Sequence, residues 1–186
     1  MIIPLTAPRW HKQLSQLRPH APFWVVPWLL ERGSLTRRLM GVCPGTITVA
    51  IQREIWGRAD GEEITALAVK RHSRVWLREV QLRCNNQPWV YARTVIPVPT
   101  LQGPAGYLMK LGNRPLGAVL FADPTVRRGQ LELASLYHRH RLYQSASAHL
   151  TDQPNVLWGR RSLFWLGGKP LLVTEVFLPT LAKEKC

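Results

Sequence analysis

Two pairs of β-prone segments, each joined by a two-residue turn, restrict what this chain can fold into more than any other feature. The first pair is residues 74–84 and 89–98 around Asn85 and Asn86, and the second is residues 157–166 and 169–179 around Gly167 and Gly168. Asn and Gly tolerate the positive φ angles that tight hairpin turns need, so each pair predicts a β-hairpin. Strands joined in this way run antiparallel, and the sequence therefore indicates a largely antiparallel sheet.

Two further segments have the pattern of strands. In residues 46–55 apolar side chains such as Ile47, Val49 and Ile51 alternate with polar ones, which is typical of a strand with one buried face. Residues 126–137 are expected to form another strand. The predicted sheet therefore contains five or six strands.

Two segments have the pattern of paired short helices. In residues 23–41, Pro27 suits the first turn of a helix, Gly33 can end it, and Ser34 is a good N-cap for the next. Residues 103–121 repeat this order of turn-forming residues. Such pairs can read DNA, but the second helix of the later pair has no basic residue, which favours flaps over a pocket.

The predicted architecture is a single α+β domain, an antiparallel sheet of about six strands with two helix-turn-helix flaps over a buried pocket. A chain of 186 residues fits one domain. We expect a loosely ordered N-terminal arm at 1–22, the domain at 23–182 and a short tail at 183–186. The polar stretch 137–156 is predicted to be an exposed loop inserted between two strands.

The charge is strongly basic, with 25 Lys and Arg against 11 Asp and Glu and a formal net charge of +14. Such an excess attracts polyanions and small anions alike. The basic residues are spread along the chain without a block of like charges, which argues against nucleic-acid binding as the main function. The composition is therefore compatible with a soluble basic protein or, more specifically, with a protein whose substrate is an anion.

Neither the cysteines nor the histidines form a convincing metal-binding pattern. Cys43, Cys84 and Cys186 are odd in number and include no C-x-x-C pair, so reduced thiols are expected rather than a disulfide framework or a zinc site. His138 and His140 lie in a polar stretch with few acids, so a solvated loop is expected in preference to a metal site.

The N-terminal region does not have the order of a secretory signal, because its charges follow its short apolar run. The most apolar segment, residues 21–30, contains Pro22 and Pro27 and is too short to span a bilayer. A soluble, cytoplasmic protein is therefore expected.

Single charges interrupt otherwise apolar strand faces. Alternation places Arg78 among Trp76, Val80 and Leu82, places Arg93 among Trp89, Tyr91 and Val95, and places Glu175 among Leu171, Val173 and Phe177. A buried charge needs a partner, since leaving it unpaired costs several kcal/mol, roughly. Glu175 could pair with Arg78 or Arg93 within the core, or both arginines could face a pocket for an organic anion. The pattern alone leaves both interpretations open.

Five longer runs resemble the chorismate pyruvate-lyase family in order and spacing. They are W-L-R-E-V (76–80), Q-P-W-V-Y-A-R-T-V-I-P-V (87–98), L-G-N-R-P-L-G (111–117), L-W-G-R-R-S (157–162) and G-K-P-L-L-V-T-E-V-F-L-P (168–179). The resemblance covers roughly residues 24–180, apart from the insertion at 137–156. It implies a six-stranded antiparallel sheet with flaps over a buried product, and cleavage of chorismate into 4-hydroxybenzoate and pyruvate for ubiquinone synthesis, without a cofactor.

The resemblance also implies roles for individual residues. Arg78 matches the family's carboxylate-binding arginine, and Glu175 matches the acidic residue at the product hydroxyl. Leu116 matches a flap position that contacts the ligand through its backbone, and Leu35 matches a second flap position, where Met also occurs. Arg93 matches a further basic pocket residue. Arg78 and Glu175 are thus the expected catalytic pair, and all five residues are expected to bind substrate.

Two other functions are compatible with this fold or charge. One is a non-catalytic small-anion-sensing domain, because related folds bind effectors in transcription regulators. The other is a basic RNA- or membrane-associated protein, whose binding to polyanions would depend steeply on salt. The lyase interpretation predicts a monomer with chorismate and 4-hydroxybenzoate as its ligands and no obligate nucleic-acid partner.

Overall fold

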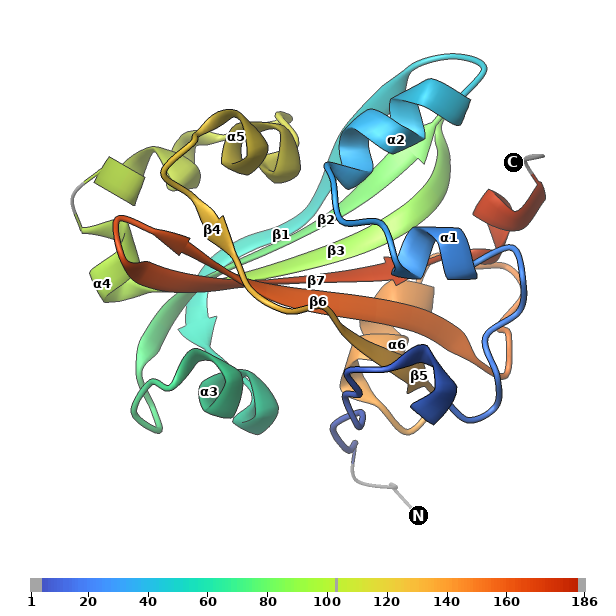
Figure 1. Cartoon of the computed structure of the whole chain (residues 1–186), viewed down its shortest axis with the longest axis horizontal. Helices are drawn as coiled ribbons and strands as arrows, with labels where there is room; N and C mark the ends of the chain where they lie inside the picture. The colour runs from blue at the N-terminus through green and yellow to red at the C-terminus, as the bar shows by residue number, and fades with distance from the viewer. Residues whose placement is uncertain (1–4, 103, 184–186) are drawn as a thin grey trace.

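The computed structural model describes residues 5–102 and 104–183 and has an open antiparallel sheet at its centre (Figure 1). Within those residues seven strands form the sheet in the order β1-β2-β3-β7-β6-β4, and β5 also pairs with β6. They are β1 Ile47–Arg58, β2 Arg74–Cys84, β3 Gln87–Pro97, β4 Arg127–Arg128, β5 Glu132–Leu136, β6 Leu157–Leu166 and β7 Lys169–Phe177. The α+β prediction is confirmed, and the extra strand arises because the predicted strand 126–137 divides into β4 and β5.

Both predicted hairpins are present, and their turn residues explain why. Asn85 and Asn86 have φ angles of 46° and 66°, and Gly167 and Gly168 have 57° and 76°. This left-handed region is open to Gly and accessible to Asn, so the two dipeptides fit their turns. Each hairpin therefore forms locally and supplies two of the central strands.

Two flaps cover one face of the sheet. The first contains α1 Val26–Leu29 and α2 Leu35–Val42, and the second contains α4 Val98–Leu101, the 3₁₀ helix η2 Pro104–Lys110 and α5 Leu116–Ala122. Figure 1 shows α2 and α5 on the same side of the sheet. No helix in the described chain is long and apolar enough to cross a membrane.

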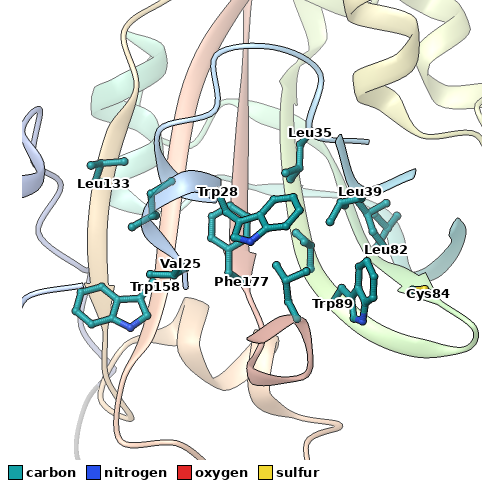
Figure 2. Close-up of a cluster of buried hydrophobic side chains, with 14 of the residues drawn as sticks. Val25, Trp28, Leu35, Leu39, Leu82, Cys84, Trp89, Leu133, Trp158 and Phe177 are labelled. Carbon is teal, nitrogen blue, oxygen red and sulfur yellow. The ribbon is translucent and has the colours of Figure 1, made fainter. Parts of the chain in front are cut away.

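The flaps are held to the sheet by buried apolar clusters. Under the first flap Trp28 and Leu39 pack with Leu82, Trp89 and Phe177 of the strands. In Figure 2 Trp28 lies beside Phe177 at the centre of this cluster. A second cluster holds α5 and η2 on the strands, with Leu108, Leu116, Leu120, Phe164 and Leu171 among its members. Together these clusters hold α2 and α5 over the sheet.

The opposite face is covered by α3 Gly61–Leu67 and α6 Arg141–Ser147 (Figure 1). The prediction of an exposed loop at 137–156 is therefore wrong for α6, whose residues Leu142, Tyr143 and Ala146 are buried against the sheet. The seven-residue helix carries few apolar residues, so its amphipathic period was hidden in a polar stretch. His140, expected in a solvated loop, is also buried and accepts a hydrogen bond from the Tyr137 backbone N–H.

The described part of the N-terminal arm packs against the domain, so the prediction of a loose arm is wrong for residues 5–22. The 3₁₀ helix η1 Leu14–Gln16 is followed by Leu17, which is fully buried. His11 exchanges backbone hydrogen bonds with Leu133 at 2.7 and 2.8 Å. At the other end η3 Pro179–Lys183 lies on the domain, and residues 184–186 of the predicted tail lie outside the described residues.

The expectation of three reduced thiols is wrong for two of them. Cys43 and Cys84 form a disulfide with Cα atoms 5.9 Å apart. Cys43 ends α2 and Cys84 ends β2, so the fold joins two sites separated by 41 residues in sequence. Nothing in local spacing reveals such a pair. Cys186 lies outside the described residues.

Candidate active site

A small cavity of about 40 Å³ lies between the flaps and the sheet. We call it the flap pocket. Its walls are mainly apolar and come from α2, α5 and strands β2, β3, β4, β6 and β7. Its charged lining residues are Arg78, Arg128, Arg160 and Glu175. Four of the five predicted site residues line it, namely Leu35, Arg78, Leu116 and Glu175.

Arg78 reaches the flap pocket from the centre of β2 and is almost completely buried. Its Nη2 donates to the backbone carbonyls of Gly112 and Arg114 at 2.8 and 3.2 Å, and its Nη1 forms an ion pair with Glu54. The carbonyls belong to the second flap, so Arg78 ties that flap to the sheet. Its Nε makes no hydrogen bond within the described residues and remains able to donate to a ligand.

Glu54 reaches Arg78 because of a bulge in β1. Ile51 pairs with Val80, but Arg53 pairs with Glu79, so one extra residue is inserted between them. The insertion moves Glu54 directly opposite Arg78, on the same face of the sheet. The strict alternation predicted for this strand ends at the bulge, so Ile55 no longer shares a face with Ile47, Val49 and Ile51.

Glu175 lies on β7 with Arg160 of β6 directly opposite. The Arg160 Nε donates to Glu175 Oε2 at 2.6 Å, and its Nη1 donates to the carbonyls of Trp28 and Glu31 at 2.8 and 2.6 Å. Arg160 therefore orients the carboxylate and anchors the first flap at once. Of the two interpretations left open by the sequence, the pairing of Glu175 with Arg78 or Arg93 is wrong, because Glu175 pairs with Arg160.

Leu35 and Leu116 are the first residues of α2 and α5. The first N–H groups of a helix have no carbonyl partner within it, so they can donate to a ligand. The Ser34 side chain caps α2 by accepting from the Arg37 N–H, whereas Pro115 gives α5 no such cap. The geometry thus agrees with backbone contacts at both leucines.

Arg93 does not reach the flap pocket, which corrects the prediction for this residue. With a two-residue turn, Cys84 pairs with Gln87, and an unbroken register would place Arg93 opposite Arg78. The register shifts between Leu82 and Arg83, so Arg93 pairs with Glu79 and points to the other face. Trp89 is the inserted residue, since Leu82 pairs with Val90 and Arg83 with Pro88.

On that face Arg93 belongs to a buried ion cluster. Its Nε and Nη2 donate to Glu63 at 2.7 and 3.0 Å, its Nη1 pairs with Glu79, and Asp60 lies 3.9 Å away. A cavity of about 380 Å³ lies beside this cluster, and its walls carry both basic and acidic side chains. Burial raises the pKa of Asp60, as does the neighbouring Glu63. Because the charges around Arg93 neutralise one another, this face is the weaker candidate for an anion site.

Sequence reasoning missed three charged residues of the flap site, namely Glu54, Arg128 and Arg160. Arg160 lies within the L-W-G-R-R-S run, and its alternation with the buried Trp158 could have identified it. The position of Glu54 depends on a bulge in β1, and Arg128 lies on a strand of only two residues. Neither residue could therefore be identified from the alternation of apolar and polar side chains. Among the described residues, no three His, Cys, Asp or Glu side chains are placed to hold a metal ion.

The sequence matches the family described as chorismate lyase over residues 7–185. It is 42% identical over 168 residues to a chorismate pyruvate-lyase from Serratia proteamaculans, covering 89% of this chain and 84% of that one. It is also 42% identical over 167 residues to a probable chorismate pyruvate-lyase from Aromatoleum aromaticum, covering 88% and 89%.

Solved structures show the same fold at low sequence identity. The C-terminal domain of a histidine utilization repressor from Pseudomonas syringae has a TM-score of 0.54 at 12% identity, covering 76% of this chain and 97% of that one. A GntR-family transcriptional regulator from Bacillus cereus has a TM-score of 0.53 at 11% identity, covering 72% and 92%. These likenesses concern the fold alone. The family match and the relatives at 42% identity show that this chain belongs to the chorismate lyase family.

Proposed function

We propose that this protein is a chorismate pyruvate-lyase that forms 4-hydroxybenzoate and pyruvate for ubiquinone synthesis. The observation that carries the proposal is the joint placement of Arg78 and Glu175 in one enclosed, largely apolar pocket. Only β3 separates their strands, so the two side chains arise roughly 10 Å apart across the sheet. In the proposed complex a six-membered ring lies between them, with its carboxylate toward Arg78 and its hydroxyl toward Glu175.

In this pose Arg78 binds the ring carboxylate, for which a guanidinium is well suited. Glu175, held by Arg160, accepts a hydrogen bond from the C4 hydroxyl. The N–H groups at Leu35 and Leu116 supply further donors from the flaps. Neither flap has to carry a reactive side chain for these contacts.

The reaction depends on the orientation of the substrate in the pocket more than on covalent catalysis. The C3–O bond of chorismate breaks, the C4 proton leaves, and the ring becomes aromatic. The departing enolpyruvate takes up a proton and becomes pyruvate. Aromatisation supplies the driving force, so a pocket that orients the ring and stabilises the leaving oxygen is sufficient, without a cofactor.

A cytoplasmic monomer fits this activity. The substrate carries two carboxylates and does not cross a bilayer unaided, so the enzyme is expected where chorismate is made. Size-exclusion chromatography with light scattering tests whether the protein is a monomer, and a dimer that withstands dilution would contradict this expectation.

The experiment is incubation of the purified, metal-free protein with chorismate, with pyruvate and 4-hydroxybenzoate measured together. Equimolar release of both, well above the spontaneous rate, is expected. If a folded protein binds 4-hydroxybenzoate without releasing pyruvate, the chain is a small-anion-sensing domain instead. Loss of both binding and release would place the function elsewhere on the molecule.

A further inference from the structure

The three arginines of the flap pocket differ in how their charge is compensated. Arg78 has Glu54, and Arg160 has Glu175. Arg128 makes no ion pair within residues 5–102 and 104–183. The pocket therefore contains one more positive charge than its carboxylates balance.

Arg128 is nevertheless held in a fixed position. It lies on β4 opposite Phe164, its Nε donates to Ser162 Oγ at 3.2 Å, and its Nη1 donates to the Arg32 carbonyl at 2.8 Å. The rings of Phe121 and Phe164 flank the guanidinium, with centroids 5.7 and 5.4 Å from its central carbon. Both acceptors are neutral, and Nη2 makes no hydrogen bond in the part of the chain that is described.

This environment is unfavourable for a cation that has no anion. Burial lowers the pKa of Arg128, and the nearby charge of Arg160 lowers it further, whereas the carboxylates of Glu175 and Glu31 raise it by less. A guanidinium still keeps its proton at neutral pH, so the positive charge persists. A carboxylate that bound here would relieve the desolvation cost and form charge-assisted hydrogen bonds.

Arg128 also lies where the pocket meets the surface. It lines the flap pocket and an outer groove of about 740 Å³. The other charged residues of the groove are Lys12 and Arg32, and no acidic side chain lines it. An approaching anion therefore meets only positive charge on the way to Arg128.

We propose that Arg128 is a substrate-binding residue that holds the enolpyruvyl carboxylate of chorismate, which approaches through the outer groove. The inference rests on the proposed function, and it gives the second carboxylate a partner that Arg93 cannot provide from the opposite face. Chorismate has this second carboxylate and 4-hydroxybenzoate lacks it. Arg128 should therefore distinguish substrate from product, whereas Arg78 should bind both.

The test compares Arg128→Gln with Arg127→Gln, its exposed neighbour on the same strand, which lies outside the flap pocket. R128Q should lower kcat/KM for chorismate by about 10- to 100-fold, the range expected for lost hydrogen bonds to a charged group. Its Kd for 4-hydroxybenzoate should stay within about twofold of wild type. R127Q should leave both quantities unchanged, and Arg78→Gln should weaken both ligands.

Two results would overturn the inference: unchanged kcat/KM in R128Q, or an equal loss of affinity for substrate and product. R128Q should unfold at the same temperature as wild type or higher, because no carboxylate loses its partner. If it does not fold, Arg128→Lys keeps the charge and should still show selective loss for chorismate. If the wild-type protein releases no pyruvate, the proposed function fails, and calorimetric Kd values for chorismate and 4-hydroxybenzoate decide the role of Arg128 separately.

Discussion

The two faces of the sheet bury arginines in different ways. On the face covered by α3 and α6, Arg93 is surrounded by Glu63, Glu79 and Asp60, which compensate its charge. On the flap face, three arginines share an apolar cavity with fewer carboxylates, and within the described part of the chain Arg128 makes no ion pair. The cavity beside Arg93 is much larger, about 380 against 40 Å³, so volume does not identify the site. Charge that the protein leaves uncompensated is what a ligand can use.

The largest expected effect is on stability, at the Arg93 cluster. Arg93→Met leaves Glu63 and Glu79 buried without their cation, and removing one partner of a buried pair costs about 3–5 kcal/mol. Urea unfolding should show this loss, while the fraction that remains folded keeps its activity per molecule. The control is Arg83→Gln on the neighbouring strand β2, because Arg83 makes no ion pair among the described residues and its side chain donates only to Gln81 and Asn86. Full stability in R93M would contradict a structural role.

The next effect is on activity, at the flap pocket. Arg78→Gln removes the proposed partner of the ring carboxylate and should lower kcat/KM by about 100-fold, roughly 3 kcal/mol. Stability should fall less than in R93M, because Glu54 is partly exposed and can be solvated. Arg74→Gln is the control, since it removes an exposed arginine from the same strand. Near-normal turnover in R78Q would contradict the assignment.

Much of this arrangement was accessible from the sequence. Turn dipeptides predicted both hairpins, and Pro and Gly spacing predicted the paired flap helices. The lone Glu175 on an apolar strand face indicated a buried charge, but it left a core ion pair and a pocket equally open. The runs shared with the family predicted Arg78, Leu35 and Leu116 at the same site. Side-chain alternation is reliable where a strand is regular, and those residues lie in regular segments or at helix starts.

The errors share one physical origin, which is that register is not a local property. One inserted residue at Trp89 sent Arg93 to the other face, and another in β1 brought Glu54 to Arg78. The disulfide and the partner of Glu175 likewise depend on which segments meet in space. Helix α6 was missed because only three buried apolar residues lie among its polar ones, and so few do not produce a recognisable helical pattern of apolar positions.

The Cys43–Cys84 disulfide links the first flap to the sheet, and it contributes to stability on the flap face of the molecule. Replacing both residues with Ser should lower the free energy of unfolding by about 2 kcal/mol under oxidising conditions, because the unfolded chain gains freedom. Under reducing conditions the variant and the wild-type protein should have similar stability. An equal difference with and without reductant would show that side-chain packing, and not the covalent link, is responsible.

The smallest effect is a pH dependence on the opposite face. Burial raises the pKa of Glu62 to about 7, although the Arg161 guanidinium and the Trp10 indole N–H lower it. In the unfolded chain a glutamate releases its proton near pH 4.5. Between these two values the folded protein keeps a proton that the unfolded chain has lost. The free energy of unfolding should therefore fall as the pH rises through this window.

Glu62→Gln removes that titration without changing the size of the side chain. Relative to wild type, the variant should gain on the order of 1–2 kcal/mol between pH 5 and pH 8, measured by urea unfolding at each pH. Glu132→Gln is the matched control, because Glu132 is the other carboxylate bound to Arg161, at 2.7 Å. In E132Q the free energy of unfolding should change with pH as it does in the wild-type protein. If E62Q and E132Q follow the same curve as wild type, Glu62 is ionised throughout, and the two faces then differ only in how their arginines are paired.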